Sequence, residues 1–459
     1  MQRLSGLDAQ FLHQETPSTP MHTLKISVLQ PDPTATDSAY DHVKHTLEQR
    51  LHLLPAFRRK LLPAPFDLGH PLWIEDPRFA FETHLRRVRL APPGNDRQFA
   101  EAIAALTEPM LDRNRPLWEL WILEGLEGGR VAAVAKVHHA VADGVASAEF
   151  LRRVHDEGPE RLVAPPPAQT WEPEPVPPKI AHALWAFSDH LSFVRHNLPA
   201  TLERARAGKA MSGPDYPPLP FTAPATPFNR SITPARAFAF ASAPLESARI
   251  VRKVFEVTIN DIVLATVAGG LRRYLQRRGA LPGLPLVAGL PVSTRLPEHQ
   301  GTLGNRLARM WVTLATDIAD PAERLRRCKT YADISKREFR ETRGARFEDW
   351  LEFLPPLLCK GLALGLRTAV QAGKFSENLL LSNVPGPPEK LTFGGMKVDA
   401  FFSVGPVLEG IGLNMTAWSY AGQLNFSMVA CRDLVPDLWE LVEELPVALD
   451  ELRVAAERD

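Results

Sequence analysis

Two adjacent histidines followed by an acid and a glycine are the residues of this chain best suited to chemistry. His138, His139, Asp143 and Gly144 form the pattern HHxxxDG. The run before them, residues 131–137, is apolar except for one lysine, and the apolar residues after them recur at helical spacing. The motif therefore falls where a strand passes into a helix, and a histidine at such a junction can reach a substrate.

Strand geometry separates the roles of the two histidines. Neighbouring side chains on a strand point to opposite faces, so His138 and His139 cannot both aim at one atom. No cysteine lies nearby, and zinc spacings such as HExxH are absent here, which argues against a metal site. One histidine is expected to do chemistry while the other packs on the far side. The alternative is that both are core histidines and that Asp143 caps the helix starting at Gly144.

Length and composition favour a globular protein with two domains. The chain has 459 residues, is 45% hydrophobic, and balances 53 basic against 53 acidic side chains. The zero net charge gives no electrostatic reason to expect nucleic acid as a partner. Cys328, Cys359 and Cys431 are odd in number and far apart, so we expect no disulfide framework and a reducing cytoplasm. The first residues lack the apolar core of a signal peptide.

One apolar stretch invites comparison with membrane segments. No window of about 20 residues is free of charge, so a membrane span is not expected. Residues 350–370 come nearest, with Lys360 and Arg367 among many leucines. This pattern suits a buried core helix, which we favour, or a helix lying in a membrane interface.

Proline-rich segments divide the chain. Residues 158–179 and 213–227 are too rich in proline for regular helix or central strand, whereas residues 180–211 have helical spacing. We therefore expect an N-terminal domain (1–157), a linker with its own helix (158–227) and a C-terminal domain (228–459). Interleaved patterns in both halves favour α/β layers with a cleft between them. The expected strands are 23–29, 118–123, 130–139, 237–241, 286–290, 307–314, 379–382 and 424–429, and the expected helices are 40–53, 98–107, 258–277, 321–337 and 437–457.

Several ordered motifs together resemble one enzyme family. The segment Pro116, Leu117, Trp118 leads into a strand, residues 124–129 turn the chain back, and the next strand ends at HHxxxDG. With the motifs of the C-terminal half, this order resembles the bacterial wax ester synthase/acyl-CoA:diacylglycerol acyltransferase family over nearly the whole chain. HHxxxDG alone is shared by the wider superfamily of CoA-dependent acyltransferases. The C-terminal motifs are 227–229 (PFN), 260–265 (NDIVLA), 291–295 (PVSTR), 304–305 (GN) and 382–387 (SNVPGP).

The resemblance implies a fold and an activity. The fold would be α/β, with two chloramphenicol-acetyltransferase-like domains packed around a tunnel and joined by the long Pro-rich helical crossover. The activity would be esterification of diacylglycerol or a long-chain fatty alcohol by a fatty acyl-CoA, which is a substrate, so no cofactor or metal is implied. Because these substrates are poorly soluble, a cytoplasmic enzyme of this kind is expected to have peripheral contact with the inner face of the membrane or with lipid droplets, without an anchor. The alternatives are an HHxxxDG acyltransferase with another acceptor or a carrier-bound donor, and a non-catalytic lipid-binding relative.

The resemblance also assigns roles within the motif. His139 would be the base that takes the proton of the acceptor hydroxyl, and His138 a packed neighbour. Asp143 would form a structural salt bridge, for which Arg295 is the candidate partner, rather than a relay to His139. Gly144 would allow a tight turn beside the site.

Donors for the oxyanion of the tetrahedral intermediate are expected from the C-terminal half. Ser382 and Asn383, at the end of a predicted strand, are the best candidates, with Asn260 behind them. The alternatives are a strand-ending turn for Ser382 and Asn383 and a helix cap for Asn260.

Overall fold

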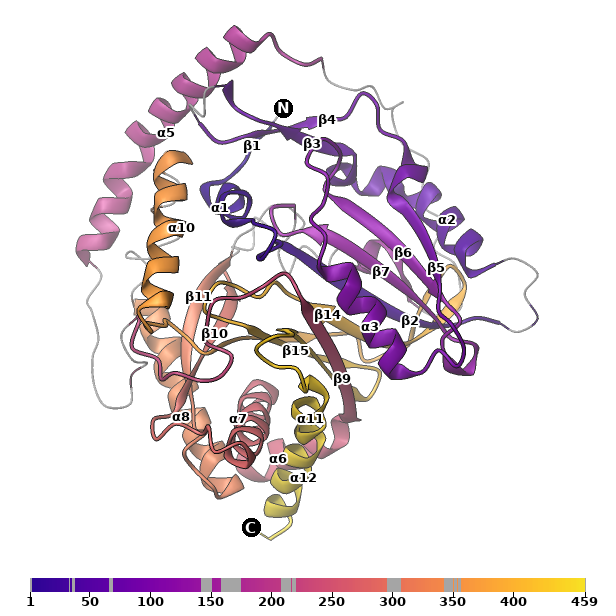
Figure 1. Cartoon of the computed structure of the whole chain (residues 1–459), viewed down its shortest axis with the longest axis vertical. Helices are drawn as coiled ribbons and strands as arrows, with labels where there is room; N and C mark the ends of the chain where they lie inside the picture. Colours follow the sequence, from indigo (N-terminus) through magenta and orange to yellow (C-terminus); the bar gives the residue numbers. More distant parts are fainter. Residues whose placement is uncertain are drawn as a thin grey trace.

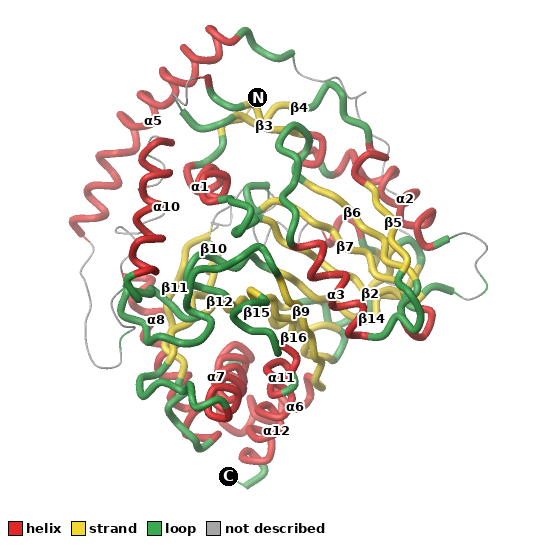
Figure 2. Tube along the Cα trace, viewed as in Figure 1, coloured by secondary structure: helices red, strands yellow, loops and turns green. Residues whose placement is uncertain are grey.

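Two large mixed sheets form the centre of the protein, and helices cover their outer surfaces (Figures 1 and 2). The computed structural model describes residues 2–32, 34, 38–65, 69–141, 151–157, 175–207, 216, 220–294, 307–341, 350, 353 and 356–458. The two-sheet α/β architecture confirms the expected fold class.

The first sheet carries the histidine pair. Its strands β6 and β7 are antiparallel neighbours, as the predicted hairpin requires, and β7 ends at His138. On its other side β7 pairs with β2, which places His22 opposite His138. The seven strands lie in the order β5 (Leu85–Arg89), β6 (Trp118–Glu124), β7 (Val131–His138), β2 (His22–Gln30), β14 (Met396–Val404), β13 (Leu391–Phe393) and β8 (Asp156–Glu157).

The second sheet is built from the C-terminal half. Its strand β12 lies between β10 and β15 and runs parallel to both, so its residues face neighbours on either side. The six strands lie in the order β11 (Leu307–Leu314), β10 (Leu286–Ser293), β12 (Leu379–Pro385), β15 (Leu413–Tyr420), β16 (Gln423–Cys431) and β9 (Arg236–Pro244).

The division of strands between the sheets does not follow the chain halves. Residues 391–404, which fall within the range expected for the C-terminal domain, form β13 and β14 of the first sheet. Strand β14 pairs antiparallel with β2, with a bulge between Val398 and Ala400. Such long-range pairing leaves no local signal in the sequence, because each strand reads only as a short apolar run.

Each large sheet has its own core, and α3 packs where the sheets meet. Phe99 and Ile103 of α3 share one apolar cluster with Val134 of the first sheet and with Phe238 and Val429 of the second. Helices α6, α7, α8 and α12 cover the outer face of the second sheet. The helices are α1 (Gly6–Gln14), α2 (Ala39–Arg50), α3 (Asp96–Thr107), α5 (Lys179–Ala207), α6 (Leu245–Phe255), α7 (Ile259–Arg277), α8 (Pro321–Glu341), α10 (Pro356–Gln371), α11 (Leu438–Val442) and α12 (Glu444–Ala456), with 3₁₀ turns at Leu51–Leu53, Pro55–Arg58, Phe81–His84 and Glu127–Gly129.

Helix α1 lies between a small third sheet and the large sheets. The small sheet has the order β1 (Gln2–Arg3), β4 (Leu72–Glu75), β3 (Arg59–Leu62). Ser5 caps the helix, because its Oγ accepts a hydrogen bond from the backbone N–H of Asp8 at 3.0 Å. The helix ends at Gln14, and Glu15 follows as its C-cap residue.

Helix α5 falls in the segment expected to link the halves, and the figures draw it beside α10. Aromatic contacts tie it to the rest of the protein: Phe193 lies 5.5 Å, between ring centroids, from Phe353, which shortly precedes α10. Within the described residues, no single helix is both long and apolar enough to cross a membrane, and only the pair α6 and α7, bent by 108°, passes that test jointly.

Candidate active site

The histidine pair lies at the edge of the first sheet, where β7 ends. His138 is the last residue of the strand and is buried, whereas His139 is partly exposed. The two residues thus have different surroundings, as strand alternation predicts. Three other predicted residues, Asp143, Gly144 and Arg295, lie outside the described residues.

His138 is held inside the protein by one hydrogen bond and by one close polar contact. Its Nδ1 accepts a hydrogen bond from the backbone N–H of Ala140 at 3.0 Å, so the ring proton is on Nε2. That nitrogen faces Oε1 of Glu15 at 3.3 Å, and both side chains are almost completely buried. His138 therefore fixes the turn that follows β7.

Glu15 connects several parts of this corner. Its Oε1 also accepts the backbone N–H of Met21 at 3.1 Å, and its Oε2 accepts Arg113 Nη2 at 2.8 Å. Burial alone would raise the pKa of Glu15, but His138, Arg113 and the Met21 amide lower it to about 2. The carboxylate is therefore ionised at all physiological pH values.

His139 is oriented through its backbone and its ring. Its N–H donates to the carbonyl of Met21 at 2.7 Å, next to the amide that Glu15 accepts. Its ring stacks on Phe11 with centroids 4.3 Å apart and an angle of 21° between the planes. Phe11 and Glu15 are four residues apart at the end of α1, so one helix end supports both histidines.

A cavity of about 440 Å³ opens at His139, between the two large sheets. Elements of the first sheet and α1 form one wall, and β10, β11, β12 and β15 form the other. Its residues are Phe11, Gln14, Thr23, Lys25, His139, Pro291, Val292, Ser293, Leu307, Arg309, Leu380, Leu381, Ser382, Asn383, Val384, Pro385, Ser403, Val404, Gly405, Pro406, Leu408, Asn414 and Thr416.

Ser382 and Asn383 line the same cavity as His139. They lie inside β12, paired with Thr416 and Ala417 of β15, so the alternative of a strand-ending turn is wrong. Asn383 Nδ2 donates to Oδ1 of Asn260 at 3.5 Å, which puts Asn260 behind it. The three residues predicted as oxyanion candidates therefore lie close together in the structure.

Asn260 does not cap α7. The N-cap is Thr258, whose Oγ1 accepts the N–H of Asp261 at 3.2 Å, while Asp261 Oδ2 accepts the N–H of Thr258 at 2.9 Å. This reciprocal pair is a capping box, and it leaves Asn260 on the first turn of the helix. The helix-cap interpretation of Asn260 is therefore wrong. The capping role belongs to Thr258 and Asp261.

A second cavity of about 310 Å³ adjoins the first, and the two share Gln14, Arg309 and Leu408. Arg309 Nη1 donates to Oε1 of the buried Glu377 at 2.7 Å. The lining also includes Arg367 and Lys374, which are exposed. The second cavity thus carries positive charge where the first is mostly apolar.

Sequence reasoning missed Glu15 and Phe11. Glu15 stands alone between a helical pattern and a threonine-proline pair, and its spacing matches no motif that we examined. Phe11 lies in residues 7–12 (LDAQFL), where the family resemblance begins, but this segment was assigned no role at the site. Their importance comes from the return of β2 beside β7, which only the folded chain shows.

Other predicted features have structural roles or lie apart from the site. Trp118 Nε1 donates to the carbonyl of Phe57 at 2.7 Å, so the Pro-Leu-Trp segment shapes the domain by packing. Cys328 and Cys431 are buried free thiols. Within the described ranges, no group of three or more His, Cys, Asp or Glu could hold a metal ion.

Comparisons with known proteins identify the family of this chain. The family model of the wax ester synthase/diacylglycerol acyltransferase catalytic domain matches residues 4–263, and that of the C-terminal domain of the same family matches residues 303–453. A candidate diacylglycerol O-acyltransferase of Mycobacterium tuberculosis is 39% identical over 467 residues, covering 99% of this chain and 98% of that protein.

Solved structures show the same architecture. The wax ester synthase/diacylglycerol acyltransferase of Marinobacter aquaeolei VT8 superposes with a TM-score of 0.71 at 28% identity, covering 99% of this chain and all of that one. The first condensation domain of the CDA synthetase shares the fold alone, with a TM-score of 0.59 at 16% identity over 98% of this chain and 96% of that one. The chain belongs to the wax ester synthase/diacylglycerol acyltransferase family.

Proposed function

We propose that this protein transfers a fatty acyl group from acyl-CoA to the hydroxyl of diacylglycerol, of a long-chain alcohol, or of both. The observation that carries the proposal is the position of His139 in a mostly apolar cavity, with Ser382 and Asn383 in the lining from the second sheet. Family membership supports the reaction class. Triacylglycerol or wax ester would be the product.

In this reaction His139 is the general base. Its Nδ1 is buried, so Nε2 is the nitrogen that meets the acceptor hydroxyl. As the hydroxyl oxygen bonds to the thioester carbon, His139 takes its proton. When the tetrahedral intermediate collapses, the C–S bond breaks and the leaving CoA thiolate regains the proton from His139. The thioester is already activated, so no acyl-enzyme is needed.

Asn383 and Ser382 would stabilise the oxyanion of that intermediate. Asn383 Nδ2 has two N–H groups, of which one is directed to Asn260. The other is then available to an oxygen in the cavity. Asn260 would act as a positioning residue, because it contacts Asn383 and is absent from the cavity lining.

The adjoining cavity suits the CoA portion of the donor. Its exposed cations, Arg367 and Lys374, would face the phosphates, and the lining that it shares with the first cavity leads toward His139. Glu409 is an acidic side chain in the same lining, so the positive charge there is partial.

A product assay tests the proposal. Purified full-length chain is given palmitoyl-CoA with hexadecanol and dipalmitoylglycerol in competition, and both CoA release and the esters are measured. We expect ester formation by the wild type and a loss of about 10²–10⁴-fold in His139→Ala. His45→Ala, at an exposed histidine of α2, is the matched control and should keep full activity. Equal ester yield from His139→Ala, or none from the wild type, would overturn the proposal.

We also propose that the enzyme works at a lipid surface. Helix α5 exposes large apolar side chains at helical spacing, among them Ile180 at 78% and Leu184 at 67% exposure, followed by Phe187 and Leu191. Leu364 of α10 lies in the stretch for which we favoured a buried core helix, but it is 66% exposed and lines the second cavity, which agrees better with the alternative of an interfacial helix. Exposed apolar side chains gathered in this way favour contact with lipid, where the acceptor dissolves.

A further inference from the structure

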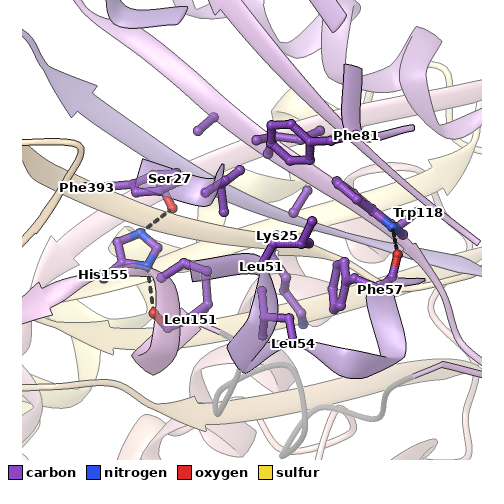
Figure 3. A pocket seen from close by; sticks show the side chains of 15 residues that line it. Lys25, Ser27, Leu51, Leu54, Phe57, Phe81, Trp118, Leu151, His155 and Phe393 are labelled. Carbon is purple, nitrogen blue, oxygen red and sulfur yellow. Dashed lines mark hydrogen bonds between the residues drawn. The ribbon is translucent and has the colours of Figure 1, made fainter. Parts of the chain in front are cut away.

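A third, narrow cavity lies against the first sheet and is separate from the two already described (Figure 3). Its unfilled space is about 20 Å³, enough for a group the size of a methyl or a water molecule. Its lining is almost wholly apolar and consists of Lys25, Ser27, Leu47, Leu51, Leu54, Phe57, Phe81, Trp118, Leu120, Ala133, Ala135, Leu151, Val154, His155 and Phe393.

The polar groups in this lining are bonded to one another. His155 Nδ1 donates to the carbonyl of Leu151 at 2.8 Å, and its Nε2 accepts the hydroxyl of Ser27 at 3.1 Å, as Figure 3 shows. Trp118 directs its N–H to the carbonyl of Phe57. These polar groups already have hydrogen-bond partners within the protein, so a ligand would bind in this cavity through apolar contacts.

The strand register connects this cavity to the active site. Thr23 and Lys25 of β2 line the cavity at His139, while Lys25 and Ser27 line the narrow one. Alternate residues of a strand share a face, so both cavities lie on one face of the first sheet, and Lys25 belongs to both linings. On β7, Ala135 pairs with Lys25, four residues before His139. Four residues of strand span about 13 Å, so the narrow cavity is within the reach of a long chain held at His139.

Size and shape decide which substrate group fits. A space of this size admits the methyl end of one unbranched chain, and it excludes a polar headgroup or two chains side by side. Ala133 and Ala135 of β7 have small side chains, which leaves the unfilled space next to the sheet. The Lys25 ammonium donates to Ser403 Oγ at 3.2 Å, which leaves its methylene stem to contact a hydrocarbon.

We propose that the narrow cavity receives the methyl end of the donor's fatty acyl chain and thereby sets the chain length that the enzyme prefers. This inference rests on the proposed acyl transfer at His139. The chain leaves the thioester at His139, passes Lys25 and ends between Ala135, Leu54 and Trp118. Burying each further methylene favours a chain by about fourfold in kcat/KM until the cavity is full.

The test is a chain-length profile. The wild type, Ala135→Leu and the milder Ala135→Val are assayed with acyl-CoA donors from octanoyl to stearoyl, at one fixed acceptor. Filling the cavity should lower kcat/KM for palmitoyl-CoA by about four- to sixteenfold and leave octanoyl-CoA unchanged. Ala132→Val is the matched control, because Ala132 lies on the opposite face of β7, in the cluster that contains Phe99 of α3. Its profile should equal that of the wild type.

A second variant should move the profile the other way. Leu54→Ala enlarges the cavity, so the optimum should shift toward stearoyl-CoA or longer donors. The same variants are then assayed with alcohols of varied length at a fixed donor, where no shift is expected. A shift with the alcohol instead of the donor, or an unchanged donor profile in Ala135→Val and Leu54→Ala, would overturn this inference. Absence of turnover by the wild type with every donor would instead overturn the proposed acyl transfer.

Discussion

Glu15 Oε1 and His138 Nε2 are 3.3 Å apart, and both side chains are 1% exposed. This pair lies behind the proposed catalytic histidine rather than in the cavity. The pair joins the end of α1 to the end of β7, although the two segments lie more than 120 residues apart in the chain. Glu15 also accepts the Met21 N–H, and the Met21 carbonyl accepts the N–H of His139, so the acid is linked to the proposed base through Met21.

Replacing Glu15 by Gln should lower kcat with little change in KM. The amide keeps the size of the side chain but removes the charge that Arg113 and His138 face, and one of its donors then opposes the Met21 N–H. We expect a loss of about tenfold in kcat, and of about 1–3 kcal/mol in the free energy of unfolding. Steady-state kinetics and thermal unfolding measure both. Arg113→Gln, at a side chain that is 46% exposed, is the control and should cost less. An unchanged kcat in Glu15→Gln would contradict this role.

The stack of Phe11 on His139 gives a second prediction. Phe11→Ala removes the ring that limits rotation of the imidazole, and a loss of up to about tenfold in kcat is expected. Phe11→Tyr keeps the ring and should retain most of the turnover. If both variants lose the same activity, the stack is not what matters. The assay is CoA release with saturating acceptor.

Asn383 and Asn260 should differ in their effects. Asn383→Ala removes a donor from the cavity and should lower kcat by about 10²–10³-fold. Asn260→Ala frees the Asn383 amide from its partner and should cost about tenfold or less. Both variants are compared at saturating palmitoyl-CoA. A wild-type rate in Asn383→Ala would exclude it as the oxyanion donor and leave Ser382.

His155 should make the fold sensitive to mild acid. Burial lowers its pKa from 6.5 to about 4 in the folded protein. The unfolded chain therefore binds the proton first, and stability that is complete above pH 6.5 falls as the pH drops toward 4, by about 3 kcal/mol. Urea unfolding between pH 7 and 4 measures this loss. His155→Gln should show a flatter dependence in that window, and an equal slope in both proteins would contradict the assignment.

The apolar face of α5 should bind lipid. Leu184→Ser together with Leu191→Ser should reduce flotation with phosphatidylglycerol-containing vesicles by tenfold or more, because each leucine loses its burial in the bilayer. Turnover of a short, soluble acceptor should stay unchanged. Leu284→Ser is the matched control, since Leu284 is 64% exposed and lies in the loop between α7 and β10 rather than on α5. Equal flotation of all three proteins would exclude this face.

The local sequence pattern predicted the positions of helices and strands better than it predicted which strands pair with one another. Apolar runs located β7, β11 and β12, and helical spacing located α3, α7 and α8 within a few residues. The expected helix 437–457 is broken into α11 and α12. Strands β14 and β15 were not predicted. Strand β15 is a buried run without clear alternation, and β14 alternates only over its first residues before it becomes fully buried.

The candidate site was predictable only where a motif carried it. HHxxxDG and the SNVPGP segment gave His139, Ser382 and Asn383, which line one cavity. Glu15 and Phe11 have no such signature, because their role depends on α1 lying against the end of β7. The relation between Asp143 and Arg295 stays a prediction, as both lie outside the described residues.

The pairing of β14 with β2 bears on how the chain can be made and divided. Lys25 and Ser403 are bonded across 378 residues, and β2 has β7 on one side and β14 on the other. A ribosome must therefore translate most of the chain before the sheet that carries His139 can close. A fragment of residues 1–157 would present β2 as an open, apolar edge, and such edges promote aggregation. Residues 1–157 are therefore not expected to fold as an independent unit, because the first sheet needs β14 from the last quarter of the polypeptide.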